Sequence, residues 1–150
     1  MVGLACSGGA VRGAGHCGVL AVIDEHHIPI QVIAGTSAGA LAGAAYARGM
    51  RPIDMMEQVR KLNWPRLIRP VLPARRALFL TTPFTELLSD RLGGATFADL
   101  DRRFIAVACD VLTGERVLLD TGDVATTVQA SMAIPGLLAC SPRSSGETIY

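Results

Sequence analysis

The chain has 150 residues, a length that fits one domain or part of one. Half of the residues are hydrophobic and the mean hydropathy is +0.38, which excludes an intrinsically disordered chain. The net charge of +1 excludes the charge imbalance that is typical of proteins binding nucleic acid or strongly acidic partners.

The first predicted elements form a strand–helix–strand unit. Val2 to Cys6 is a short apolar run and predicts a buried strand, and the glycine-rich loop Ser7 to Gly13 follows it. Ala14 to His27 has helical spacing and ends before Pro29, and Gln31 to Ala34 predicts the second strand. Such a unit makes the two strands parallel neighbours. Both following loops then lie at the carboxyl edge of the sheet, where open α/β sheets place their sites.

The second strand leads into Gly35-Thr36-Ser37-Ala38-Gly39, followed by small residues that favour a helix. This pattern is typical of a strand, a sharp turn and a helix with the serine at the turn. A side chain at position 35 or 39 would collide with the neighbouring strand or helix, and the serine backbone is strained. The hydroxyl would be held over the end of the sheet, near the positive end of a helix. The alternative is an ordinary turn with a solvated serine.

The segment after this motif contains two predicted helices and one stretch without a pattern. The first helix runs to about Arg48 with Gly49 as its C-cap, and the second covers Ile53 to Leu62. From Asn63 to Leu80, prolines and arginines are mixed with apolar side chains. The stretch is either an irregular surface connection or a basic, apolar flap that covers the site or meets a membrane.

The last part of the chain is predicted to add helices and a hairpin. The predicted elements are, in order, a helix over Thr82–Leu92, a strand over Phe104–Cys109, a returning strand over Arg116–Leu119, a helix over Asp123–Met132 capped by Asp123 or Thr121, an extended piece over Leu137–Ser141 and a strand that begins at Thr148. Together the elements predict an α/β fold in which a mostly parallel sheet is flanked by helices.

A nucleophilic serine needs a base, and the histidines limit the choice. His16, His26 and His27 all precede Ser37, whereas an α/β-hydrolase triad runs in the order serine, acid, histidine. That triad is therefore excluded within this chain. We expect His16 to be a packed helix residue rather than a base. A carboxylate that acts directly on the serine remains.

The glycine-rich loop offers backbone donors. Gly8, Gly9 and Ala10 follow a strand and precede a helix, so their N–H groups can form an oxyanion hole or hold a phosphate. The loop lacks the full spacing of a nucleotide-binding motif, which makes a nucleotide-binding α/β domain the weakest hypothesis. Arg12 either anchors the loop, meets an anionic head group, or forms a structural salt bridge.

The cysteines and the N-terminus bear on the compartment. Cys6, Cys17, Cys109 and Cys140 have no metal-type spacing and lie in apolar or Ala/Gly-rich stretches, so we expect small, reduced core residues in a cytoplasmic protein. No basic segment precedes the first apolar residues, so no signal peptide is expected. The low-charge run Ile28 to Ala47 contains Pro29 and is interpreted as buried strand and helix, not as a membrane span.

Taken together, the motifs resemble those of the patatin-like phospholipases, in particular their bacterial members. The resemblance is carried by Ser7-Gly8-Gly9-Ala10-Val11-Arg12-Gly13 with the following Ala14–Leu20, by Gly35–Gly39, by Ala108-Cys109-Asp110 with Thr113-Gly114-Glu115, and by Ala130-Ser131-Met132-Ala133-Ile134-Pro135-Gly136. It spans nearly the whole chain and is least specific over residues 50–95.

The resemblance implies a three-layer fold and a Ser-Asp dyad that hydrolyses acyl esters of lipids without a metal or other cofactor. Ser37 would be the nucleophile within the motif Gly35, Thr36, Ala38 and Gly39, and Gly8, Gly9 and Ala10 with Arg12 would form the oxyanion hole. Ala10 stands where members of the family often have a third glycine. The implied partner is a lipid or other acyl ester, with room for peripheral contact to a membrane and no role for nucleic acid.

The resemblance leaves the aspartate of the dyad unassigned. The family's Asp-Gly-Gly or Asp-Gly-Ala motif does not occur in the chain, so we expect the aspartate beyond residue 150 and interpret residues 1–150 as the N-terminal portion of an incomplete domain. Asp110 and then Glu147 are the internal candidates, although Asp110 is favoured as a cap of the hairpin turn.

Two consequences follow from a missing aspartate. The alternative to an enzyme is a non-catalytic lipid- or protein-binding module with the same fold. The last strand would also be cut short, so we expect an exposed sheet edge, marginal stability and a tendency to associate.

Overall fold

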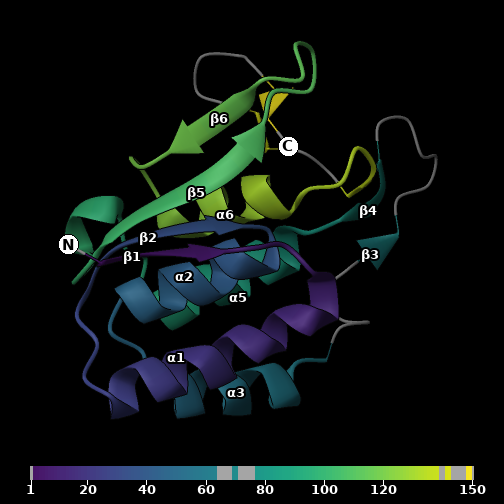
Figure 1. Cartoon of the computed structure of the whole chain (residues 1–150). Coiled ribbons are helices and arrows are strands. Elements are labelled where there is room, and N and C mark those ends of the chain that lie inside the picture. The colour runs from purple at the N-terminus through teal and green to yellow at the C-terminus, as the bar shows by residue number, and fades with distance from the viewer. Residues whose placement is uncertain (1, 64–68, 71–76, 139–140, 143–147, 150) are drawn as a thin grey trace.

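A computed structural model describes residues 2–63, 69–70, 77–138, 141–142 and 148–149, and Figure 1 shows the arrangement. The elements before residue 64 are β1 (Val2–Cys6), η1 (Ala10–Ala14), α1 (Gly15–Glu25), β2 (Ile30–Thr36), α2 (Ala38–Ala47) and α3 (Pro52–Lys61). The later elements are β3 (Arg69–Pro70), β4 (Ala77–Leu80), α5 (Thr82–Leu92), η2 (Phe97–Asp99), β5 (Arg103–Cys109), β6 (Arg116–Leu119), α6 (Val124–Met132), β7 (Gly136–Leu138), β8 (Ser141–Pro142) and β9 (Thr148–Ile149).

The main sheet has four strands in the order β1-β2-β5-β6. β1, β2 and β5 are parallel, and β6 returns antiparallel to β5 as the second strand of a hairpin. The predicted α/β fold with a mostly parallel sheet and flanking helices is confirmed. The parallel pairing of β1 and β2 is confirmed as well, and it brings the glycine-rich loop and the serine motif to the same sheet edge.

Helix α2 lies at the centre of the molecule, directly below β1 and β2 in Figure 1. Nine of its ten residues are buried, and nearly all of them are alanine or glycine. A helix that is apolar all round is buried on all sides. Its small side chains also allow a close approach to the sheet. A Cβ added at Gly43 would lie 3.0 Å from both Ile33 Cγ2 and Phe104 Cε2.

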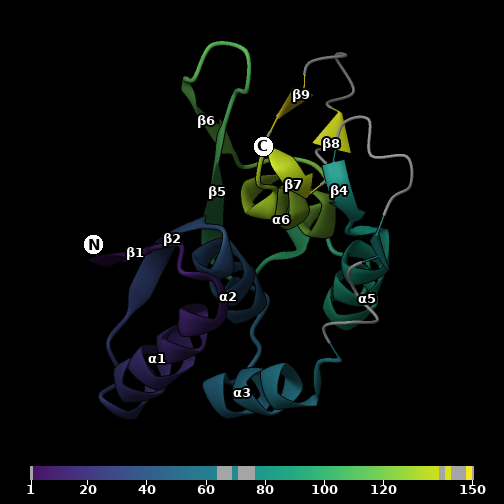
Figure 2. The same cartoon turned by 90° about the vertical axis from the view of Figure 1, so that its right-hand side faces the viewer.

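A second layer of helices lies on the other side of α2. Figures 1 and 2 both show α1 and α3 side by side, farther from the sheet than α2. α1 buries Cys17 and Leu20, whereas Ala21 is exposed. The observed helix is shorter than the predicted one over 14–27, because residues 10–14 form a 3-10 turn and His27 has a positive φ of 52°.

The two faces of the main sheet differ in burial. The face toward α2 and α6 carries Ile33, Phe104 and Ala106, which are at most 2% exposed. Side chains of the opposite face, such as Val32, Ile105 and Leu118, are half-buried or exposed, and Leu118 is 53% exposed. An exposed apolar face of this kind would favour association of the chain, and that tendency stays a prediction.

Several predicted boundaries are confirmed. The bounds of β1, α5 and β6 are as predicted, and Asp123 caps α6 by accepting a hydrogen bond from the Thr126 N–H at 2.7 Å. The C-cap of α2 is Arg48, and Gly49, which was predicted to be the C-cap, is the next residue and ends the helix with a φ of 89°. The stretch 63–80 holds β3 and β4, but most of it lies outside the described residues, as does Cys140. Among the described helices, none combines the length and the apolar character that a membrane crossing requires.

Candidate active site

Ser37 stands at a sharp turn between β2 and α2. Its backbone has φ 53° and ψ −119°, a conformation that costs a residue other than glycine about 1–3 kcal/mol. The neighbouring glycines explain how the turn fits. A Cβ at Gly35 would lie 2.6 Å from Ala40 Cα, and one at Gly39 would lie 2.6 Å from Ser7 O. Both positions therefore accept only glycine, as the sequence predicted.

The other residues of the motif continue its two flanking elements. Thr36 is the exposed last residue of β2, where it pairs with Val107 of β5. Ala38 is buried and begins α2. Ser37 is thus held by a strand on one side and by the positive end of a ten-residue helix on the other.

The glycine-rich loop is pressed against this turn. A Cβ at Gly13 would collide with the Cβ of Ala38, and one at Gly8 would lie 3.4 Å from Ser37 Cβ. In the part of the chain that the structure describes, no hydrogen bond uses the N–H of Gly8, Gly9 or Ala10. The loop therefore has three backbone donors without a partner there, and the first of its three residues, Gly8, lies against the serine.

Ala10 carries backbone strain in this loop. Its φ is 47°, in the left-handed region that glycine adopts at little cost. The N–H survives the change from glycine to alanine, but the residue holds a conformation that is unfavourable for a Cβ.

His16 does not approach the serine hydroxyl. Its Nε2 lies 2.9 Å from the Ser7 carbonyl oxygen, so a ring N–H can donate there and tie the start of the loop to α1. This contact agrees with the expected packing role. Arg12 is exposed and takes part in no ion pair among the described residues, so the structural salt bridge considered for it is not observed there.

One residue of the site was not singled out from the sequence. The Ser131 hydroxyl, on α6, accepts a hydrogen bond from the Ser37 N–H at 2.8 Å and donates one to the Val107 carbonyl at 2.6 Å. Its position in the Ala130–Gly136 motif was the only signal in the sequence. Nothing in that motif indicated a partner 94 residues earlier.

Of the two internal candidates for the base, the structure describes Asp110. Asp110 Oδ1 accepts hydrogen bonds from the N–H groups of Leu112 and Thr113 at 2.8 and 2.9 Å. The predicted role of Asp110 as a turn cap is therefore confirmed. Glu147 lies outside the described residues.

A cavity of about 380 Å³ begins beside Ser37 and extends along α2. Its wall is almost entirely apolar, with contributions from η1, α1, α2, α3, α5 and α6. The lining includes Ser37, Leu41 and Ala45 of the α2 turn and helix, Met55 on α3, and Leu88 and Leu92 on α5. A volume in this range suits a small-molecule or chain-like ligand.

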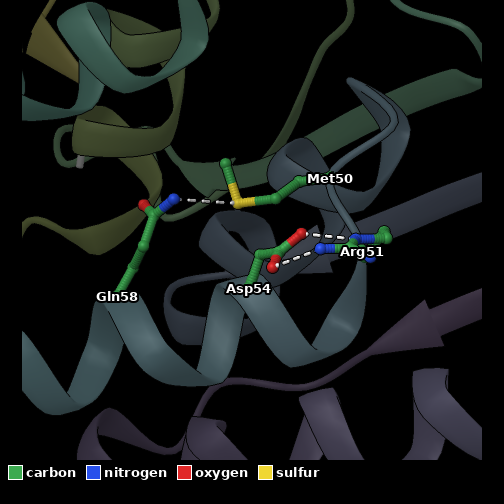
Figure 3. Close-up of polar contacts among 4 residues, drawn as sticks. All are labelled: Met50, Arg51, Asp54 and Gln58. Carbon is green, nitrogen blue, oxygen red and sulfur yellow. Dashed lines mark hydrogen bonds and ion pairs between the residues drawn. The ribbon is translucent and has the colours of Figure 1, made fainter.

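Helix α3 forms an outer wall of this cavity, and Figure 3 shows two of the polar contacts that hold it. Gln58, which lines the cavity, directs its Nε2 toward Met50 Sδ at 3.5 Å. Arg51 forms a two-pronged ion pair with Asp54 in the first turn of the helix, at 2.7 and 2.9 Å. The Arg51 hydrogen bond holds the pKa of the Asp54 carboxyl below its usual range.

The described cysteines differ in exposure. Cys6 and Cys17 are buried, and burial raises the pKa of both thiols, which fits the expected core role. Cys109 is exposed, contrary to the expectation, because it points away from the helices at the end of β5. In the described ranges, no three His, Cys, Asp or Glu side chains gather in a way that would hold a metal ion.

Two known proteins illustrate the similarity of this sequence to others. The chain is 33% identical over 150 residues to an uncharacterized NTE family protein of Mycobacterium tuberculosis, a match that covers 99% of this chain and 25% of that protein. It is 31% identical over 151 residues to a patatin-like phospholipase domain-containing protein of Caenorhabditis elegans, covering 95% of this chain and 11% of that protein. The chain thus spans a quarter or less of the length of these relatives.

Solved structures share the fold at low sequence identity. VipD from Legionella pneumophila matches with a TM-score of 0.75 and 16% identity, over 98% of this chain and 45% of that one. The type III effector protein ExoU matches with a TM-score of 0.66 and 18% identity, over 97% of this chain and 41% of that one.

A family model also matches nearly the whole chain. A model described as patatin-like phospholipase covers residues 4–150, which include the glycine-rich loop, the serine turn and α6. The chain therefore belongs to the patatin-like phospholipase family, whose members are lipid hydrolases.

Proposed function

We propose that this chain carries the nucleophile and the oxyanion hole of a serine hydrolase that cleaves acyl esters of lipids. The observation that carries the proposal is the contact of two turns at one sheet edge. The strained Ser37 turn lies against a loop with three backbone N–H groups that have no partner among the described residues. A nucleophile beside donors aimed at one point is the arrangement that acyl transfer requires.

In this proposal Ser37 Oγ attacks the ester carbonyl carbon while a carboxylate takes the hydroxyl proton. The negative charge that forms on the carbonyl oxygen is stabilised by the N–H groups of Gly8, Gly9 and Ala10 and by the positive end of α2. The alcohol leaves with the proton from the carboxyl group, and water then releases the acyl group from Ser37 by the reverse sequence. Arg12, exposed at the loop, would meet an anionic head group.

The carboxylate in this scheme is an aspartate outside residues 1–150. Asp110 is the internal alternative, but one of its carboxylate oxygens accepts two backbone hydrogen bonds in the hairpin turn. The relatives contain several times more chain than this sequence, which leaves room for the aspartate. Asp110→Asn keeps the accepting oxygen and removes the charge, so it is expected to leave hydrolysis intact.

The cavity supports a lipid acyl group as the substrate part next to the serine. Its apolar wall runs from Ser37 along α2, so an acyl chain that enters it would place its ester at the hydroxyl. Burial of methylene groups there would contribute about 0.8 kcal/mol each. A polar or charged acyl group would lose this contribution.

The test is hydrolysis of a short-chain p-nitrophenyl ester together with labelling by a fluorophosphonate. In the full-length protein that carries these residues, wild type is compared with Ser37→Ala and with Ser89→Ala, a control serine on α5 that does not line the cavity. Turnover and labelling are expected in wild type and Ser89→Ala and should be lost in Ser37→Ala.

The same experiment separates the enzyme from the binding module. Absence of labelling in a folded protein that carries the downstream aspartate would contradict the proposal. Binding to phospholipid vesicles that is equal in wild type and Ser37→Ala, without ester turnover, would then support a non-catalytic lipid-binding module.

A further inference from the structure

The hydroxyl of Ser131 occupies the point where β2 leaves the main sheet. Thr36, the last residue of β2, pairs with Val107 of β5, and the chain then turns away at Ser37. The Ser131 hydroxyl lies between the two strands here, accepting from the Ser37 N–H at 2.8 Å and donating to the Val107 carbonyl at 2.6 Å. A side chain of α6 thus connects the Ser37 N–H and the Val107 carbonyl at the point where the strand pairing of β2 with β5 ends.

We propose that Ser131 is a positioning residue for the nucleophile, an inference that rests on the proposed function of Ser37. The bridge fixes the backbone nitrogen of Ser37 relative to β5 and thereby fixes where Ser37 Oγ points. Ser131 is itself 8% exposed, so water has little access to replace its hydroxyl.

The bridge helps to hold the strained backbone conformation of Ser37. A left-handed conformation of a residue other than glycine persists only where its surroundings over-determine it. The glycine contacts exclude other atoms from the turn but form no directional bond to Ser37. The hydrogen bond from the Ser37 N–H supplies the direction, because it requires the donor to point at Ser131.

The bridge also determines which backbone N–H groups remain available to stabilise an oxyanion. The Ser37 N–H is already used by Ser131 and is not free to stabilise an oxyanion. The donors left for that role are those of the glycine-rich loop and the first residues of α2. Loss of the bridge would free the Ser37 N–H and let the turn relax, which disturbs both the nucleophile and the oxyanion geometry.

The test compares Ser131→Ala with Thr127→Val in the full-length protein that carries these residues. Thr127 is a matched control because it lies one turn earlier on α6, is equally 8% exposed, and donates its hydroxyl to Asp123 O rather than to the site. Each substitution removes one buried hydroxyl from the same helix. Ser131→Ala leaves two backbone groups without this partner and Thr127→Val leaves one, so the melting temperature should fall in both variants and more in Ser131→Ala.

Only Ser131→Ala should slow the chemistry. The rate constant for labelling of Ser37 by a fluorophosphonate, and kcat for the p-nitrophenyl ester, should fall by about 10- to 100-fold with KM unchanged, because small misplacements of a reacting group cost rate. Ser131→Thr, which keeps a hydroxyl at the same position, should recover most of the rate. Exchange of the Ser37 amide proton with solvent should become faster in Ser131→Ala and not in Thr127→Val.

Each other outcome has a clear meaning. If wild type is labelled and Ser131→Ala reacts as fast, or Thr127→Val reacts as slowly as Ser131→Ala, the positioning role is wrong while the proposed function stands. If wild type is not labelled, the proposed function fails and this inference fails with it. If Ser131→Ala does not fold, Ser131→Cys replaces it, since its thiol is a weak donor and acceptor, and an undiminished rate there would overturn the inference.

Discussion

The two ends of α2 are held by different kinds of contact, although the helix between them is buried along its length. At the Ser37 end the contacts are made by backbone atoms and by the smallest side chains, as at Gly39 and Gly13. At the other end they are made by large polar groups. The Tyr46 hydroxyl donates to Asp24 of α1, and the Arg102 guanidinium lies 4.5 Å from the centre of the Tyr46 ring.

Because of this difference, the Ser37 end of the helix tolerates less change than the Tyr46 end. Backbone atoms in contact with backbone atoms cannot move aside, so the Ser37 end has a fixed position and no space for an added methyl group. Long side chains can change rotamer without moving the helix, so the Tyr46 end can be altered at a moderate cost. The following substitutions test this contrast, from the largest expected effect to the smallest.

Gly39→Ala should have the largest effect. Its Cβ would collide with the backbone of Cys6 and Ser7, which no change of rotamer can relieve. We expect the free energy of unfolding in urea to fall by about 3 kcal/mol or more, at the upper end of overpacking costs. Gly18→Ala is the control, since a Cβ there meets no atom within 4 Å in the middle of α1, and it should stabilise by about 0.5–1 kcal/mol. Equal stabilities for the two variants would refute the steric explanation.

Tyr46 should make the protein sensitive to alkaline pH. Burial, followed by the hydrogen bond to Asp24, raises the pKa of Tyr46 from 10.0 to about 12. Because the folded pKa lies above the unfolded one, this contribution is complete below pH 10 and is lost as the pH rises to 12. The loss amounts to about 3 kcal/mol.

The measurement is chemical denaturation between pH 8 and pH 12 for wild type and Tyr46→Phe. Phenylalanine keeps a ring beneath Arg102 but has no proton to lose. The thiols of Cys6 and Cys17 also destabilise the fold at high pH, yet they are present in both proteins and cancel in the difference. Parallel pH profiles for the two proteins would show that Tyr46 does not ionise as described.

Asp123→Ala should have the smallest effect of the three. The carboxylate accepts a hydrogen bond from the Thr126 N–H at the start of α6, and loss of such a cap costs about 1 kcal/mol. Asp120→Ala is a suitable control, because Asp120 is exposed and makes no hydrogen bond among the described residues. Since Ser131 lies in the last turn of α6, rates at Ser37 should stay near those of wild type. A large loss of rate would mean that the cap and the serine turn are more tightly coupled.

Local signals in the sequence were sufficient for much of this fold. Three of these signals act within a few residues, and the structure confirms them. They are the glycines on either side of Ser37, the helix N-cap at Asp123 and the end of a helix at Gly49. The parallel pairing of β1 with β2 followed from the order strand, glycine-rich loop, helix, strand in the sequence.

Contacts between distant segments could not be predicted in the same way. The partner of the Ser37 N–H lies 94 residues away, and the partner of His16 depends on how the glycine-rich loop folds back. Exposure of Cys109 depends on which face of β5 the helices cover. The sequence pattern alone does not contain that choice, because both faces of the strand carry apolar residues.

Because the glycine-rich loop approaches α2 so closely, one wall of the cavity can adjust less than the other. In the wall made by η1 and the start of α2 the two elements cannot move closer together, because no side chain fits between Gly13 and Ala38. Ligands of different shape therefore have to be accommodated by the opposite wall, where Met50 and Met55 lie with the leucines of α5. Methionine is unbranched and adapts to irregular surfaces at little cost. The reacting end of a ligand would thus be held to one geometry, while its tail meets a surface that can reshape around it.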